Sequence, residues 1–303
     1  MREKSLSIIV PIYGVEEYIL EFLESIVPQL LDSTELILIN DGTKDKSMQI
    51  CHNFLGGNYD NIVILEQSNQ GQSVARNYGI QQAKGEYIGF LDPDDYVRSD
   101  YISKITECIQ NNRDVDIIDF KAFTFIHESK KIINTVNNNL KEGLHNSFEK
   151  EYLATIFSNC SWQSWLRIVK HSFFKDIKFP EGLLLQDIHV FPSIYIKSCK
   201  IYHISEALIY YRVRGGSAVT RVNDKLIFSY KEAIKYLECQ NPKEIIQLSL
   251  NRLYVDYLVH TFTFYGLKSF IREFAAFKEN RNIKVIFPVF YTIFMHLLKS
   301  IKR

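Results

Sequence analysis

The stretch Glu86-Tyr-Ile-Gly-Phe-Leu-Asp-Pro-Asp-Asp95 decides how the fold is interpreted. Its apolar run, residues 87–91, is short and bounded by turn residues, which is typical of a buried strand. Three carboxylates then follow within four residues, at Asp92, Asp94 and Asp95. The carboxyl ends of strands in an open α/β sheet are where ligands bind. The turn therefore indicates either a site for a divalent cation, which one or two carboxylates and substrate phosphates can hold, or an acidic cap on the next helix.

Strand-like and helix-like segments alternate on both sides of this stretch. Buried apolar runs predict strands at residues 7–12, 35–40, 61–65, 86–91 and 115–120. Between them, apolar residues at helical spacing predict helices at residues 16–30, about 45–54, 70–83 and 99–110. This rhythm predicts an α/β protein with a mostly parallel, doubly wound sheet flanked by helices.

The pattern changes after residue 120. Residues 121–136 resemble an antiparallel hairpin, and residues 200–213 resemble a strand. Helices are expected at residues 148–174, at 185–199, and from 223 to the end, with a helix start at Asn241-Pro242.

Bulk composition excludes several classes of protein. The 303 residues are 46% hydrophobic, enough for a sizeable core, and Lys+Arg 36 against Asp+Glu 35 gives a net charge of +1. Such a balance argues against nucleic acid as a partner. The five cysteines have no metal-ligand spacing, and we find neither a signal peptide nor a transmembrane stretch. We therefore expect a cytoplasmic protein with reduced thiols.

Three predicted strand ends and one helix start meet at the same edge of the sheet. They supply the backbone of Pro11 and Ile12 with the ring of Tyr13 for a flat ligand, Asp41 as an acceptor, and Arg76 as a phosphate partner. With the acidic turn as a metal site, this set suits a nucleoside diphosphate with Mg²⁺ or Mn²⁺. The glycine-rich signatures of dinucleotide and P-loop sites are absent from the sequence.

Four strings in this region resemble the family 2 glycosyltransferases in order and spacing: Ser7–Tyr13, Ile39–Asp45, Asn69–Gly79 and Ala83–Asp95. The resemblance implies the GT-A fold, a nucleotide-sugar donor and inversion at the anomeric carbon. Weaker similarity at residues 179–187 and 210–217 is to the bacterial polysaccharide branch, which includes O-antigen and capsule enzymes. The expected organisation is a catalytic domain, residues 1–220, and a C-terminal helical region, residues 221–303. Within the domain, residues 1–115 would bind the nucleotide sugar and residues 116–220 the acceptor.

The resemblance also implies roles for individual residues. Pro11, Ile12 and Tyr13 would lie against the base, and Asp41 would accept a hydrogen bond from it, which favours uracil. Arg76 would place the nucleotide. Asp92 would lie near the ribose, Asp94 would bind the metal that bridges the diphosphate, and Asp95 would support the site or cap a helix.

Asp187 falls where the family has its catalytic base. An inverting transfer needs a base to take the proton of the acceptor hydroxyl as it attacks. The apolar run Leu183–Leu185 before it is expected to limit its hydration and raise its pKa. In isolation, an N-cap of the following helix would be the better interpretation of Asp187, and only its position relative to the other motifs favours the base.

The chain departs from the family pattern at several positions. Gly14, Asn40 and Gln186 stand where Asn, Asp and Glu are usual. Arg214 stands where a metal-binding His is often found, so Arg212 or Arg214 would neutralise the leaving diphosphate. His203 and His189 are substitute metal ligands or, more simply, structural residues.

Two further features leave alternatives open. Trp162 and Trp165 either pack in the core or stack on a sugar, and we expect Trp165 to line the acceptor side. The last segment, residues 283–303, is apolar and basic, which suits a membrane interface, a core position or a homodimer contact.

Together these features predict a metal-dependent glycosyltransferase (a hexosyltransferase). It would move a sugar from a donor such as a UDP-sugar to a glycan, in bacterial surface polysaccharide synthesis. The acceptor would be lipid-linked, with the enzyme at the inner face of the membrane. The alternatives are a degenerate nucleotide-sugar-binding protein and a sugar nucleotidyltransferase, although the latter would need a basic, glycine-rich loop after the first strand.

Overall fold

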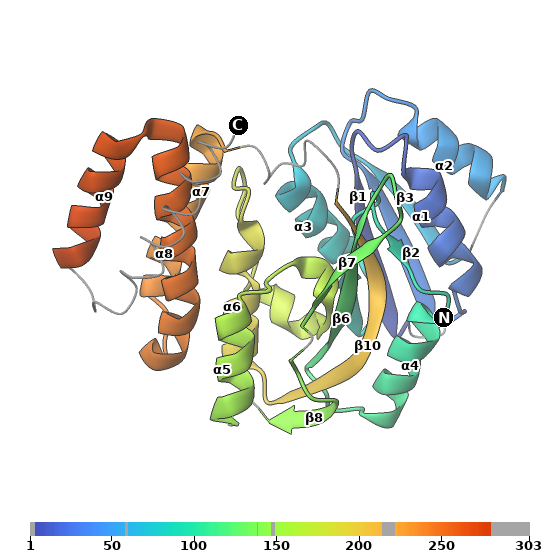
Figure 1. Ribbon diagram of the computed structural model, residues 1–303. Coiled ribbons are helices and arrows are strands. Elements are labelled where there is room, and N and C mark those ends of the chain that lie inside the picture. The colour runs from blue at the N-terminus through green and yellow to red at the C-terminus, as the bar shows by residue number, and fades with distance from the viewer. Residues whose placement is uncertain (1–3, 58–59, 138, 147–148, 214–221, 280–303) are drawn as a thin grey trace. The chain divides into compact units, whose positions relative to one another are not determined.

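The computed structural model describes residues 4–279 except 58–59, 138, 147–148 and 214–221 (Figure 1). The chain divides into two compact units. Unit 1 comprises residues 1–182 and 186–214, and unit 2 comprises residues 183–185 and 215–303.

The first half of unit 1 confirms the predicted alternation. Its parallel strands are β1 (Leu6–Ile12), β2 (Thr34–Asn40), β3 (Ile62–Glu66) and β4 (Tyr87–Phe90). They are joined by α1 (Ile19–Ile26), α2 (Ser47–Leu55) and α3 (Gln72–Gln82), and α4 (Tyr101–Asn111) follows β4. The 3-10 turn η1 (Val27–Gln29) extends α1. Because β1, β2 and β4 are parallel neighbours, their carboxyl ends meet at one edge.

The second half of unit 1 makes the sheet mixed. It adds β5 (Tyr96–Val97), β6 (Ile117–Ile126), β7 (Ile132–Val136), β8 (Gly143–Asn146), β9 (Arg167–Lys170) and β10 (Lys200–Val213). The described strands run in the order β3-β2-β1-β4-β9-β6-β10-β5, with β7 paired to β6 and β8 to β10. Strand β9 lies antiparallel between β4 and β6. The predicted 121–136 hairpin is confirmed as β6–β7.

The helix predicted over residues 148–174 is largely wrong. Only α5 (Lys150–Asn159) forms there, and the chain continues through η2 (Ser164–Leu166), β9 and η3 (His171–Lys175). Apolar residues of β9 sit in the middle of the sheet, where pairing with two neighbours overrides local helical spacing. Farther on, η4 (Gln186–His189) and α6 (Phe191–Lys197) replace the single helix predicted at 185–199.

Alternate residues of the parallel strands face different helices. Ile8, Val10 and Ile12 share a buried cluster with residues of α1, α2 and α4. Helix α3 covers the other face (Figure 1). At Gly79 it comes so close to β1 that an added Cβ would lie 2.5 Å from Ile9 Cγ2. This close approach sets the N-terminus of α3, which carries Gln72 to Arg76, beside the carboxyl edge of the sheet.

Unit 2 is helical in its described part, as predicted. It contains α7 (Asp224–Glu238), α8 (Lys243–Tyr265) and α9 (Leu267–Glu279), and α8 packs against both others. The predicted helix start at Asn241-Pro242 is confirmed, since Pro242 directly precedes α8. Of the helices described, none has the length and apolarity needed to cross a membrane. The segment 283–303 lies outside the described residues.

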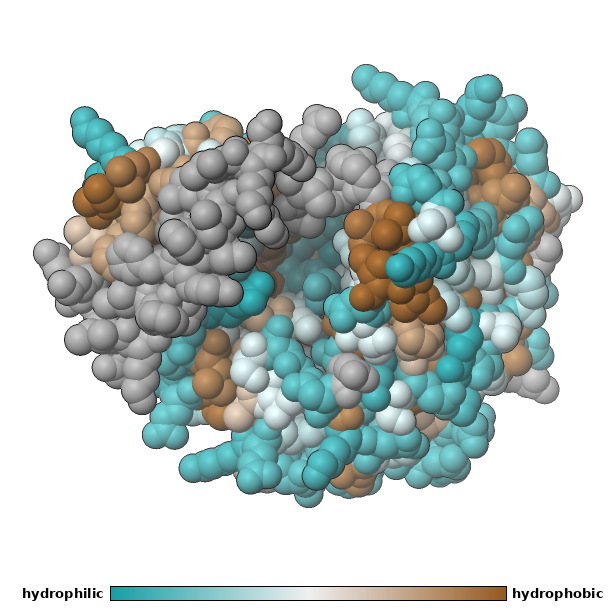
Figure 2. Space-filling model, viewed as in Figure 1, coloured by the Kyte–Doolittle hydropathy of each residue, from teal (hydrophilic) through white to brown (hydrophobic). Residues whose placement is uncertain are grey.

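Strand β7 is paired on one side only among the described strands. A hydrophobic patch covers this part of the surface in Figure 2, and Ile132 and Ile133 of β7 are about half exposed.

Candidate active site

The acidic turn follows β4 at the carboxyl edge of the sheet. The Asp95 amide donates to the Asp92 carbonyl at 3.1 Å and closes the turn. Asp94 is half-buried, whereas Asp95 is buried, with Oδ1 accepting from the Arg212 amide at 2.7 Å and Oδ2 without a hydrogen-bond partner. Burial, reinforced by the neighbouring carboxylates, raises the pKa of Asp95 well above its usual range. Without a cation, the turn therefore holds more negative charge than its surroundings stabilise.

Arg76 joins this turn to the predicted base. Its guanidinium, 2% exposed, lies with Nη2 3.0 Å from Asp92 Oδ1 and Nη1 3.2 Å from Asp187 Oδ1. The rings of Phe179 and Phe90 lie 5.3 and 5.9 Å from its Cζ and fix its plane. Burial raises the pKa of Asp92 to about 6, although Arg76 opposes the shift. Arg76, Asp92 and Asp187 thus form one charged cluster. The sequence predicted each of them as a site residue in its own motif, but not the contacts between them.

Asp187 is held from two directions. It lies in η4, and its Oδ2 accepts from the Ser164 amide at 3.2 Å while Oδ1 meets Arg76. Its side chain is 22% exposed, so it is accessible yet poorly hydrated. Burial raises its pKa, and Arg76, the Ser164 amide and Arg167 only partly counteract that rise. A carboxylate with a raised pKa and an open face is suited to take a proton.

A second chain of hydrogen bonds, which the sequence did not reveal, runs beside Arg76. Gln72 Nε2 donates to Asp92 Oδ1 at 3.0 Å, and Gln186 Nε2 donates to Gln72 Oε1 at 2.7 Å. The Ser73 hydroxyl donates to Gln186 Oε1. The available signal was the Gln at position 186, because an amide can donate and accept where the usual Glu can only accept.

The expected base-binding side lies at the ends of β1 and β2. Pro11 and Ile12 are buried in β1, while the ring of Tyr13 is 52% exposed and open to a flat ligand. Asp41 is buried and accepts from Gln67 Nε2 at 2.7 Å and from the amides of Gln70 and Gly71 at 2.9 Å. In this structure Asp41 therefore anchors the loop that leads into α3.

Gly42 is the reason that the two loops come together. Its φ is +65°, and an added Cβ would lie 2.8 Å from the Asn69 amide nitrogen. Glycine alone adopts this conformation without strain and leaves room for the neighbouring loop.

Arg212 does not lie where the sequence predicted. Its side chain is fully buried: Nε donates to the Asp94 carbonyl at 2.6 Å, Nη1 contacts His127 Nδ1 at 2.6 Å, and Nη2 pairs with Glu21. The expectation that it meets the leaving diphosphate does not fit this burial. Arg212 instead stabilises the acidic turn, because its Nε donates to the Asp94 carbonyl and its backbone amide donates to Asp95 Oδ1.

Trp165 and His203 are also interior residues. Trp165 is 4% exposed and stacks on Tyr211 at 5.0 Å between ring centroids, so the expected sugar contact does not fit. Trp162 is 2% exposed. His203 is fully buried, and its Nδ1 lies 2.6 Å from Asp119 Oδ1. On β10, His203 comes nine positions before Arg212, which contacts the acidic turn, so His203 is not beside Asp94. His189 is half-buried at the end of η4, and Arg214 lies outside the described residues.

The acidic turn fits a hard cation of the Mg²⁺ or Mn²⁺ kind. Within the described residues, no three side chains of His, Cys, Asp or Glu form a ready metal cage. Mg²⁺ does not require one, since it keeps several waters and takes substrate phosphates as ligands. The unpartnered Asp95 Oδ2 and the half-buried Asp94 carboxylate are the oxygen ligands that the turn would offer to such an ion.

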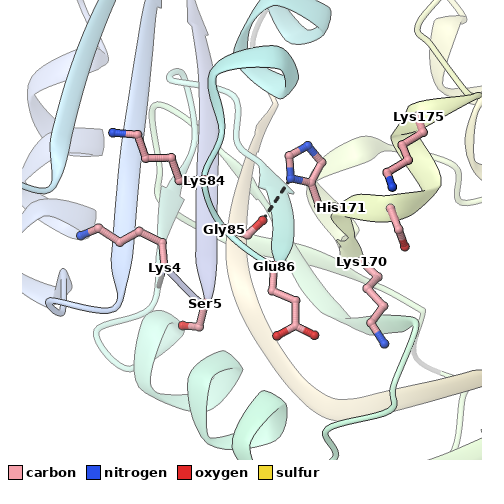
Figure 3. A pocket seen from close by; sticks show the side chains of 9 residues that line it. Lys4, Ser5, Lys84, Gly85, Glu86, Lys170, His171 and Lys175 are labelled. Atoms are coloured by element: carbon pink, nitrogen blue, oxygen red, sulfur yellow. Dashed lines mark hydrogen bonds between the residues drawn. The ribbon is translucent and has the colours of Figure 1, made fainter. Parts of the chain in front are cut away.

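A cavity of about 550 Å³ lies at the opposite edge of the sheet, around Lys4, Gly85 and His171. Figure 3 shows that Lys4 and Lys84 point away from its centre. The Lys4 ammonium instead donates to the carbonyls of Asp32 and Thr34 at 2.7 and 3.0 Å. The lysines do not converge on one point, so the cavity is not a built anion site.

The acidic turn at the carboxyl edge of the α/β sheet, joined through Arg76 to Asp187, is the arrangement expected of a glycosyltransferase-type domain. Residues 7–167 match the model of the glycosyl transferase family 2, and the chain belongs to this family.

Several curated relatives are similar over about 70% of the chain. It is 34% identical over 229 residues to the minor teichoic acid biosynthesis protein GgaB of Bacillus subtilis, covering 72% of this chain and 25% of that protein. It is 28% identical over 227 residues to glycosyltransferase GlyA of Streptococcus pneumoniae, covering 71% and 31%. The chain thus spans about a quarter to a third of the length of these two relatives.

Solved structures confirm the fold. The Staphylococcus aureus TarS fragment 1–349 in complex with UDP-GlcNAc matches with a TM-score of 0.64 and 20% identity, covering 86% of this chain and 73% of that chain. The mannosyltransferase PcManGT of Pyrobaculum calidifontis, in complex with GDP-Man and Mn²⁺, matches with a TM-score of 0.61 and 14% identity, covering 98% and 81%. The predicted GT-A architecture is therefore correct.

Proposed function

We propose that this protein transfers a sugar from a UDP-sugar to a hydroxyl group of a glycan, with inversion and with the help of Mn²⁺ or Mg²⁺. The observation that carries the proposal is the Arg76 bridge between Asp92 and Asp187. It supports a site in which the acidic turn binds the diphosphate and Asp187, whose pKa is raised, acts as the base, as a single displacement at the anomeric carbon requires.

Each residue of the site has a separate role in the proposed reaction. Asp187 Oδ1 and Oδ2 are fixed by Arg76 and the Ser164 amide, so its carboxylate can accept the proton of the attacking hydroxyl. Arg76, which pairs with Asp92, would bring positive charge close to the donor phosphates. A cation at Asp94, supported by Asp92 and Asp95, would stabilise the charge of the departing diphosphate.

The choice of uridine rests on the base-binding side. The exposed ring of Tyr13 offers a stacking surface at the end of β1, and Asp41 lies at the end of β2, its parallel neighbour. A carboxylate acceptor suits the ring N–H of uracil, and TarS, which shares the fold, is in complex with UDP-GlcNAc.

The proposed setting is bacterial surface polysaccharide or teichoic acid synthesis, which the name of GgaB supports. A lipid-linked acceptor is consistent with the apolar and basic sequence of residues 283–303. Removal of the chain after Asn282 should abolish binding to anionic vesicles. If the full chain does not bind them either, the membrane proposal fails.

Donor binding and turnover are tested separately. UDP with Mn²⁺ should raise the melting temperature, and a panel of UDP-sugars should include one that raises it further. Asp94→Ala should abolish the metal-dependent part, whereas Asp100→Ala, which removes an exposed carboxylate paired with Arg98, should not. Equal metal-dependent stabilisation of wild type and Asp94→Ala would overturn the metal assignment. Donor binding without transfer to any glycan hydroxyl would favour the degenerate binding protein.

A further inference from the structure

Arg167 is a buried cation without an ion-pair partner among the described residues. It lies on β9 and is 1% exposed. Its Nη2 donates to the Ser161 carbonyl, whereas Nε and Nη1 have no hydrogen-bond partner. A buried guanidinium normally has a paired carboxylate, because leaving a charge unpaired away from water is costly. This arrangement therefore needs an explanation.

The carboxylate opposite Arg167 in the strand register forms no hydrogen bond with it. Asp119 of β6 is opposite Arg167, but its oxygens accept from Tyr195 Oη at 2.8 Å and from Tyr152 Oη at 3.2 Å, and contact His203 Nδ1 at 2.6 Å. Arg167 therefore forms no direct ion pair with Asp119.

Aromatic rings keep the guanidinium in place. Its Cζ lies 4.7 Å from the ring centroid of Phe191, 5.3 Å from Tyr195 and 5.9 Å from Trp162. Such contacts stabilise a cation without cancelling its field.

Two routes connect Arg167 with Asp187. The first is structural: Arg167 holds the Ser161 carbonyl, and the segment that starts there delivers the Ser164 amide to Asp187 Oδ2 at 3.2 Å. The second is electrostatic: besides Arg76, Arg167 is the other cation that lowers the pKa of Asp187 against the effect of burial.

We propose that Arg167 is a positioning residue for the base: it fixes the segment Ser161–Ser164 against Asp187 and supplies an unpaired positive charge that keeps the Asp187 carboxylate ready to accept a proton. The proposal rests on the proposed function, in which Asp187 is the base.

The expected pH dependence follows from the charges around Asp187. Arg76 on α3 and Arg167 on β9 favour its ionised form, Asp92 after β4 disfavours it, and His189 lies two positions further on in η4. Removal of Arg167 leaves burial and the Asp92 charge opposed by Arg76 and the Ser164 amide. The pKa of Asp187 should then rise further, and the acid limb of kcat/KM should move to higher pH.

The test compares Arg167→Met, which keeps an apolar stem among the rings, with Arg167→Lys, which keeps the charge. Transfer is measured from pH 5.5 to 9. We expect Arg167→Met to lose at least about tenfold more of its kcat/KM at pH 6 than at pH 8.5, since one pKa unit is a factor of ten in the ionised fraction. Its KM for the donor should stay within about twofold, and Arg167→Lys should keep the acid limb of the wild type. A uniform loss at every pH, or none, would overturn the proposal.

A second measurement does not require sugar transfer. It can use either of two substitutions of Arg167, so it does not depend on one variant being stable. ¹³C NMR of labelled Asp carboxyls, with Asp187→Asn used to assign the signal, should give a higher Asp187 pKa in Arg167→Met or Arg167→Gln than in wild type. An unchanged pKa in the folded variant refutes the electrostatic link. If Asp187→Asn still transfers sugar, the proposed function fails instead, and the NMR result remains interpretable by itself.

Discussion

Asp92 and Asp187, 95 positions apart in the sequence, share the guanidinium of Arg76, whose Nη2 and Nη1 lie 3.0 and 3.2 Å from their Oδ1 atoms. In the proposed function, Arg76 would therefore contact both the donor side and the acceptor side of the site. The guanidinium is buried and planar. If one carboxylate moves, the other must therefore move with it, or one of the two charge-assisted hydrogen bonds to Arg76 breaks.

Asp187→Asn should separate catalysis from stability. The variant should still bind UDP with Mn²⁺, but transfer should fall by about 10²–10⁴-fold because the proton acceptor is lost. The raised pKa of Asp187 means that folded wild type loses stability as pH rises from the ordinary 3.8 through the folded value. The Asn variant avoids this loss, so at pH 8 its melting temperature should equal or exceed that of wild type. An active variant would remove Asp187 as the base.

Gln186→Glu should impair the enzyme although Glu is usual in the family. A carboxylate cannot donate to Gln72 Oε1, so the Gln72 amide must turn and release Asp92. The added charge also lies near Asp92 and Asp187. We expect kcat/KM to fall by about three- to tenfold, most strongly at low pH. Gln82→Glu adds the same charge at an exposed position at the end of α3 and serves as the control. Higher activity in Gln186→Glu would contradict this view of the hydrogen-bond chain.

Arg212→Met should loosen the acidic turn. The substitution removes the donor to the Asp94 carbonyl and the partner of Glu21, and we expect about 1–3 kcal/mol lower stability. Mn²⁺-dependent binding of UDP should weaken as well, as titration calorimetry would show. Arg98→Met is the matched control, since this partly exposed arginine pairs with Asp100 and Glu206. Its loss should cost less than about 1 kcal/mol and leave binding unchanged. Identical effects of the two substitutions on UDP binding would refute the role given to Arg212.

Asp45 should contribute to stability at neutral pH and not in acid. Burial opposes its ionisation, yet hydrogen bonds from Ser47, Thr43 and the Glu16 amide outweigh this and lower its pKa to about 2. The folded state then binds its proton less tightly than the unfolded chain, whose ordinary value is 3.8. The contribution is complete above pH 4 and is lost as pH falls through 2.

Asp45→Asn should therefore be less stable than wild type at pH 7, by about 1 kcal/mol because solvent screens much of the effect, and the gap should close between pH 4 and pH 2. Urea denaturation at each pH measures it. Asp176→Asn, at an exposed carboxylate, should show no such gap. A gap for Asp45→Asn that is independent of pH would mean that packing, not charge, explains it.

Local patterns were sufficient for the first half of unit 1. Each strand from β1 to β4 is a compact apolar run, and each connecting helix has an apolar face at 3.6-residue spacing, so the elements can be recognised without their partners. The acidic turn and Arg76 were likewise identifiable, because their residue types and order carry the chemistry.

The remaining features depend on contacts between distant segments. Strand β9 is only Arg167–Lys170, and its position between β4 and β6 depends on pairing that the local sequence does not encode. The same applies to Trp165 and Arg212, whose residue types suit a binding site but whose side chains are buried. Gln72 and Ser73 gain their importance only when η4 comes to lie beside α3.

The clamp of Arg212 on the acidic turn has an evolutionary consequence. The turn is held through main-chain groups and through residues of β10 and α1, not through any part of a bound sugar. Mutations in the loops that would meet the sugar can thus accumulate without changing the proposed metal and phosphate site. A lineage with this architecture can try new sugars while the chemical step that all of them need is left intact.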